Sequence, residues 1–110
     1  MEIRYYRTLS GHSPVRRFVE QMPVSVQEDF LIALDRLRRG ERLSMPLSKP
    51  LANVVTGLHE LRFRDAGNIF RVFYFVKVGD AIYLVHAIQK KTQKLPGKDK
   101  KLILKRLKEI

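Results

Sequence analysis

The sequence predicts an α+β fold in the order β-α-α-β-β-β-α: a small antiparallel-rich sheet, an N-terminal helical hairpin packed on it and a C-terminal basic helix. Three observations predict it. Two amphipathic helical stretches follow a short β-prone start, three β-prone runs joined by tight turns come next, and a lysine-rich amphipathic stretch comes last. The 110 residues suit one domain spanning 1–110.

The first strand is expected over Glu2–Thr8, because Ile3 and Tyr5 alternate with Arg4 and Tyr6 and the stretch is aromatic, and Gly11 ends it. A helix should then begin at Ser13 and Pro14, as an N-cap followed by proline at the first helical position, and end at Pro23. Its apolar residues recur at helical spacing: Val15, Phe18, Val19 and Met22.

The second helix is expected over Ser25–Arg39. Ser25 followed by Glu28 matches a capping box, and Gly40 is a typical stop. An apolar stripe repeats along it: Val26, Phe30, Ala33, Leu34 and Leu37. The following stretch, 41–56, shows no clear period and is expected to connect the helices to the sheet.

The meander comprises strands over 57–64 and 69–75, joined by a tight turn at 65–68, and a nearly continuous apolar strand over 81–88. After a polar, basic stretch, a helix is expected over 99–110. Its lysines are expected either to contact RNA or to form a solvated face, with its leucines covering the edge of the sheet, and both can hold at once.

Arginines interrupt the first two strands of the meander. Strand alternation places Arg62 and Arg64 with Glu60 on one face, directed outward, and His59 with core residues on the other. Arg71 lies in a strand with two apolar faces, where a guanidinium group needs water, a carboxylate or a ligand.

Two interpretations of these arginines remain open. One is ion pairing across the hairpin, such as Glu60 with Arg71. The other is a basic cleft, which Lys90 and Lys91 at the end of the next strand favour. Closely spaced guanidinium groups suit phosphate.

The overall charge favours the second interpretation. Lys and Arg total 22 against 11 Asp and Glu, giving a net charge of +11, which points to nucleic acid or another polyanion, the alternative being a solvated surface. The chain has no cysteine and three separated histidines, which excludes disulfides and does not point to a metal or cofactor. With no secretory signal and no long apolar run, a cytoplasmic protein without membrane contact is expected.

Three motifs in order resemble the RelE/ParE toxin superfamily, and most closely its phage-derived HigB-like branch. They are Gly57-Leu58-His59-Glu60-Leu61-Arg62, Phe70-Arg71-Val72-Phe73-Tyr74 and Gln89-Lys90-Lys91-Thr92-Gln93-Lys94-Leu95-Pro96. Lys49-Pro50-Leu51 fits an element upstream of them, and the resemblance covers about Ile3 to Leu107.

The resemblance implies a RelE-like sheet carrying two helices and a type II toxin that cleaves mRNA in the ribosomal A site. It also implies a helix-turn-helix antitoxin as partner. Arg71 matches the family's most recurrent arginine, Arg62 that of its Glu-Leu-Arg motif, and Lys90 and Lys91 its basic pair. No aromatic residue follows Tyr83, which puts in doubt any mechanism that needs a C-terminal tyrosine.

Metal-free RNA cleavage needs positive charge on the phosphorane and an acid and a base. The candidate catalytic residues are Arg71, Arg62, Lys91 and Glu60, and the candidate RNA-binding residues are Lys90, Lys94, Arg64 and Lys49. Glu60 can act as a base only if no arginine pairs with it. The alternative for Arg64 is that it is only a solvated neighbour of the site. His59 and His86 are expected to be structural residues in the core. The alternative functions are a ParE-like inhibitor of DNA gyrase and a non-catalytic basic RNA-binding module.

Overall fold

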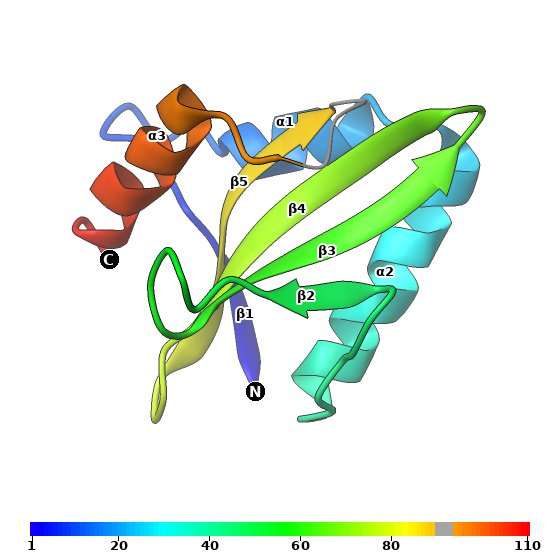
Figure 1. The fold of residues 1–110 in the computed structure, drawn as a ribbon. Coiled ribbons are helices and arrows are strands. Elements are labelled where there is room, and N and C mark those ends of the chain that lie inside the picture. Colours follow the sequence, from blue (N-terminus) through cyan, green and yellow to red (C-terminus); the bar gives the residue numbers. More distant parts are fainter. Residues whose placement is uncertain (90–93) are drawn as a thin grey trace.

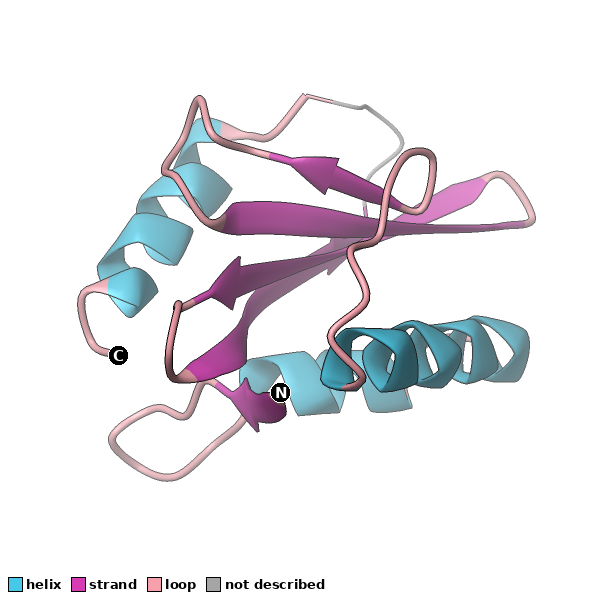
Figure 2. Ribbon diagram, turned by 90° about the horizontal axis from the view of Figure 1, so that it is seen from below, coloured by secondary structure: helices cyan, strands magenta, loops and turns pink. Residues whose placement is uncertain are grey.

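The computed structural model describes residues 1–89 and 94–110, and within them five strands form one mixed sheet with helices on both faces (Figure 1, Figure 2). The α+β class and the predicted order of the main elements are confirmed. The bounds are β1 (Glu2–Tyr5), α1 (Pro14–Glu20), α2 (Val24–Arg38), β2 (Ser48–Pro50), β3 (Leu58–Asp65), β4 (Asn68–Val76), β5 (Ala81–Gln89) and α3 (Gly97–Leu107).

The sheet has the order β1-β5-β4-β3-β2, with β1 parallel to β5 and all other neighbours antiparallel. The expectation that 41–56 only connects was wrong, because β2 lies within it and pairs with β3. This strand has three residues and ends at Pro50, and proline is tolerated there because β2 is an edge strand.

The β3–β4 hairpin closes through two residues with positive φ, Ala66 at 48° and Gly67 at 82°, between the paired Asp65 and Asn68. Such a two-residue turn matches the right-handed twist of the strands. The turn fixes the register of the hairpin, and with it which side chains of β3 and β4 lie opposite one another.

Helices α1 and α2 cover one face of the sheet, as the predicted helical hairpin. Phe30 is fully buried in this core and packs edge-on against Phe63 of β3, with ring centroids 6.2 Å apart. The predicted capping box at Ser25 was wrong, because α2 begins earlier and Pro23 precedes its first turn. Gln27 instead joins the helices, donating to the backbone oxygens of Glu20 and Met22.

The opposite face is covered by α3, which packs Ile103 into a second core with Phe73, Val85 and Ile88. A β-bulge lies in β5: Phe73 pairs with His86 and Tyr74 with Leu84, so Val85 has no partner on β4. On this face Arg62, predicted to face outward, is largely covered: its side chain is 12% exposed and pairs with Glu60. Of that predicted pair, Arg64 is the exposed one.

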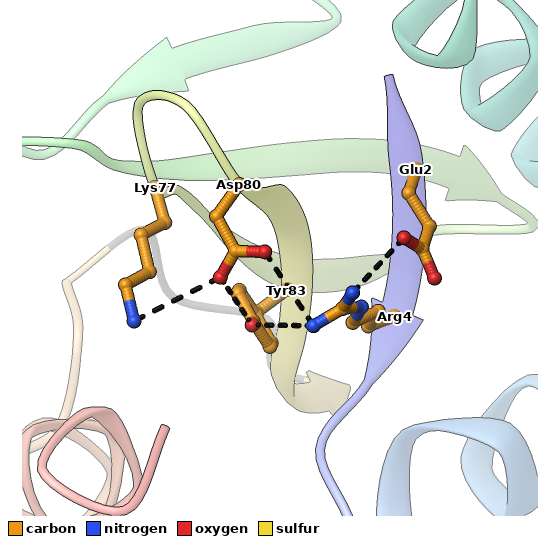
Figure 3. A network of polar contacts seen from close by, with 5 residues as sticks. All are labelled: Glu2, Arg4, Lys77, Asp80 and Tyr83. Atoms are coloured by element: carbon orange, nitrogen blue, oxygen red, sulfur yellow. Dashed lines mark hydrogen bonds and ion pairs between the residues drawn. The ribbon is translucent and has the colours of Figure 1, made fainter.

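A polar network fastens β1 to the turn between β4 and β5 (Figure 3). Arg4 donates to Glu2 at 3.0 Å and to the hydroxyl of Tyr83 at 3.1 Å, and lies 3.5 Å from Asp80. Tyr83 in turn donates to Asp80 at 2.7 Å. Exposed pairs of this kind contribute little individually, but here they form one connected network between β1 and the β4–β5 turn.

The helices of the described residues include none that is long and apolar enough to cross a membrane.

Candidate phosphate-binding site

Two arginines lie directly opposite each other on the face that α3 covers. The hairpin register pairs Arg62 of β3 with Arg71 of β4, and Glu60 lies two residues before Arg62 on the same face. The Glu60 carboxylate is 0% exposed and accepts from both guanidinium groups. Arg62 Nε lies 2.5 Å from Oε2, and Arg71 contacts Oε1 through Nε and Nη2.

The charges of Glu60, Arg62 and Arg71, which we call the triad, do not cancel. One carboxylate faces two guanidinium groups, and the side chain of Arg71 is 2% exposed. Like charges opposite each other on neighbouring strands destabilise a sheet, and burial increases the cost. Glu60 offsets one positive charge, so the triad retains one that an anion can neutralise.

Glu60 is therefore not the free carboxylate that a general base requires. Its candidacy depended on the absence of an arginine partner, and the structure gives it two. What the carboxylate does here is fix the orientation of Arg62 and Arg71.

Arg71 also contacts groups beyond the carboxylate. Its guanidinium group lies 5.5 Å from the ring centroid of Phe73, and Nη1 donates a long hydrogen bond of 3.4 Å to the backbone oxygen of Lys94. The side chains of Arg62, Arg64, Ile69 and Arg71 line a shallow recess with no room for a water molecule. From outside, an anion therefore reaches Arg64 and the edge of Arg62 first, with Arg71 behind them.

Two of the other predicted RNA-binding residues, Lys94 and Lys49, lie around this face. Lys94 is exposed and its backbone contacts Arg71. Lys49, exposed on β2, pairs in register with Glu60 and so lies on the same face of the sheet. Lys90 and Lys91 lie outside the described residues.

A groove of about 620 Å³ adjoins the arginines on the side of α2. Ile32 and Met45 contribute exposed apolar surface to it, and Arg36, Arg62 and Arg64 contribute positive charge. Arg62 and Arg64 thus line both the recess and the groove.

His59 lies away from this site, on the face that α1 and α2 cover. It stacks on Tyr74 with ring centroids 5.0 Å apart, and burial lowers its pKa. The placement agrees with the core position that strand alternation predicts.

His86 lies on the same face as the arginines, two residues before Ile88, the partner of Arg71. Its Nε2 lies 2.8 Å from Asp99 of α3 and its Nδ1 3.1 Å from Arg106 of the same helix. Burial lowers the pKa of His86, and the Arg106 charge acts in the same direction, whereas the hydrogen bond to Asp99 opposes it. Sequence reasoning found none of these contacts, and the only signal was an acid and an arginine seven residues apart in a basic helix.

Among the described residues, no three His, Asp or Glu side chains are grouped so that they could hold a metal ion.

Comparison with known proteins gives one family. The family model described as "phage derived protein Gp49-like (DUF891)" matches residues 17–108, a range that contains every candidate site residue. No curated protein matches the chain in sequence.

Proposed function

The chain belongs to the phage-derived Gp49-like family, a toxin-like family related to RelE and ParE, and on that premise we propose that it is the toxin of a type II toxin–antitoxin system. Its proposed activity is that of the HigB-like branch: a ribosome-dependent mRNA endonuclease, or mRNA interferase, that stops translation. Its proposed partners are a helix-turn-helix antitoxin and mRNA in the ribosomal A site, in the cytoplasm.

The observation that carries the proposal is the uncompensated charge of the Glu60–Arg62–Arg71 triad. A purely structural ion pair needs one arginine for one carboxylate, whereas here two arginines share Glu60. The second positive charge is largely desolvated, and its neutralisation by a phosphate group would be favourable. The exposed Arg64, Lys49 and Lys94 extend the positive surface around the triad.

The reaction proposed for this site is attack of an RNA 2′-hydroxyl on the adjacent phosphorus, with loss of the 5′-oxygen. Arg62 and Lys91 would hold the scissile phosphate, and Arg71 would stabilise the developing negative charge from behind Arg62. Lys90, Lys94, Arg64 and Lys49 would contact the neighbouring backbone.

None of the three titratable groups considered as acids and bases is free at this site. Glu60 pairs with two arginines, His86 is held by α3, and His59 lies on the other face. The ribosome would therefore orient the 2′-hydroxyl for attack, a positioning effect that can supply much of a rate enhancement.

Expression in a bacterial host tests the proposal. The wild-type chain should arrest growth and produce new 5′ ends within messages, mapped by primer extension. Arg62→Ala should relieve both effects, whereas Arg36→Ala, which removes an exposed arginine of α2, should relieve neither. Arrest with intact messages and broken DNA would contradict the proposal and favour gyrase inhibition, and RNA binding without arrest would leave only a binding module.

Arg71 requires a variant that does not leave Glu60 short of its buried partner. Glu60→Leu combined with Arg71→Met replaces the pair with apolar residues of similar size, which often preserves a fold. A folded double variant, judged by circular dichroism, should be non-toxic. Full toxicity of that folded protein would overturn the role given to Arg71.

A further inference from the structure

The ring of His86 joins both ends of α3 to β5. Asp99, in the first turn of the helix, lies 2.8 Å from Nε2, and Arg106, in its last turn, lies 3.1 Å from Nδ1. Ile103, fully buried, lies between them in sequence. An acid near the N-terminus and a cation near the C-terminus also match the dipole of the helix.

The β-bulge makes this arrangement possible. Val85 has no partner on β4, so its carbonyl is available, and Arg106 Nη1 donates to it at 2.8 Å. The same guanidinium nitrogen therefore contacts the bulge and the His86 ring. The bulge places Val85 and His86 on one face, toward α3.

The contacts fix one protonation state of the ring. A guanidinium group can only donate, so Nδ1 must accept from Arg106, and the proton then lies on Nε2, which donates to Asp99. The ring also stacks on Phe73 of β4, with centroids 5.9 Å apart, and the Arg71 guanidinium lies over that same Phe73 ring. A proton on Nδ1 would place two hydrogen-bond donors, Nδ1 and Arg106 Nη1, against each other. The nearby charges of Arg106 and Arg71 would also disfavour a positively charged ring.

The same helix leads directly to the candidate site. Lys94 lies three residues before α3 begins at Gly97, and its backbone oxygen accepts from Arg71. The position of α3 on the sheet therefore bears on whether the Lys94 backbone lies against Arg71.

We propose that His86 is a positioning residue. With Asp99 and Arg106 it locks α3 onto β5 and so holds the Lys94 backbone against Arg71. Protonation of the His86 ring releases α3 from β5 and the Lys94 backbone from Arg71. The inference rests on the proposed function for the role of the Arg71 site, but the lock itself can be measured on the protein alone.

Two substitutions separate hydrogen bonding from packing. His86→Gln keeps one donor for Asp99 and one acceptor for Arg106 and cannot titrate. His86→Phe keeps the stacking on Phe73 and loses both hydrogen bonds. In hydrogen–deuterium exchange near neutral pH, His86→Phe should lower the protection of the α3 amides about tenfold or more, the scale of one lost hydrogen bond to a charged group. His86→Gln should stay close to wild type.

Nitrogen-15 NMR of the ring should show a neutral imidazole with its proton on Nε2. As the pH is lowered, α3 protection and message cleavage on programmed ribosomes should fall together with the titration of this ring. Neither should follow it in His86→Gln. If His86→Phe does not fold, judged by circular dichroism, Arg106→Met and Asp99→Ala break the same contacts from the helix.

Each result decides the inference. Unchanged α3 protection in His86→Phe, or a ring protonated on Nδ1, would overturn the lock. A wild-type chain that cleaves no message would refute the proposed function, while the exchange and NMR results would still decide whether the lock exists. Loss of α3 protection with full cleavage activity would keep the lock and overturn its link to Arg71.

Discussion

Arg62 and Arg71 lie directly opposite each other on β3 and β4, and the buried carboxylate of Glu60 contacts both guanidinium groups. Two like charges in register would destabilise the hairpin without that carboxylate. Glu60 thus makes it possible for the fold to carry two arginines at one place. The positive charge left over is the physical basis of the proposed phosphate site.

Glu60→Gln should destabilise the protein strongly, because it leaves two largely buried guanidinium groups without a counter-charge. We expect a loss of about 3 kcal/mol in the free energy of unfolding, measured by urea denaturation. Glu41→Gln, which removes the carboxylate of an exposed pair with Arg36, should cost less than about 0.5 kcal/mol. Equal losses in the two variants would contradict the description of the triad as a desolvated cluster.

The hydroxyls of Ser48 and Tyr74 form a buried hydrogen bond of 2.7 Å that attaches β2 and β4 across β3. Ser48→Ala and Tyr74→Phe should each cost about 1–2 kcal/mol in unfolding free energy, because each leaves the other hydroxyl unsatisfied. The double variant should cost clearly less than the sum. Simple additivity in this double-mutant cycle would show that the two hydroxyls do not depend on each other.

Gly57, which directly precedes β3, has φ of 96°, and a β-carbon there would lie 3.0 Å from Phe75 and 3.2 Å from the backbone oxygen of Val76. Gly57→Ala should therefore cost more than backbone strain alone, about 2–4 kcal/mol in thermal or urea unfolding. The matched control is Gly67→Ala, where φ is 82° and the added carbon meets open space. It should lose only about 1 kcal/mol.

Stability should fall as the pH is lowered through the range in which free histidines titrate. Burial lowers the pKa of His59 and of His86 below 6.5, so the unfolded chain binds more protons than the folded one. The contribution of these histidines is complete above pH 6.5 and is lost as the pH falls from 6.5 through the folded pKa values.

The unfolding free energy from urea titrations between pH 7 and 5 measures this slope. His86→Gln combined with His59→Phe should flatten it, since neither replacement titrates. A wild-type stability that is constant or rises toward pH 5 would contradict the burial of the two neutral rings.

Sequence periodicity predicted what depends on neighbours along the chain. The apolar stripe of α2 and the alternation in β3 placed Phe30, Leu61 and Phe63 in one core correctly. The pairing of β2 with β3 was missed, because three residues ending in proline carry no period. The coverage of Arg62 was missed, because alternation gives the face on which a side chain lies and not what packs beside it there.

The candidate site shows the same division. Alternation grouped Arg62 with Glu60, and the hairpin suggested a pair between Glu60 and Arg71. One carboxylate contacts both arginines because of the strand register. The two-residue turn at Ala66 and Gly67 sets that register. The His86–Asp99–Arg106 contacts depend on a bulge and a docked helix, neither of which leaves a periodic signal in the sequence.

The most direct test of the phosphate site is the rate of message cleavage by purified protein on ribosomes programmed with a defined mRNA. Arg62→Ala should lower that rate about a hundredfold relative to wild type, the scale of one lost donor to a transition-state charge. Arg36→Ala, on the far side of the adjoining groove, should cleave at close to the wild-type rate. An Arg62→Ala protein that folds and cleaves as fast as wild type would contradict the assignment of this face as the phosphate site.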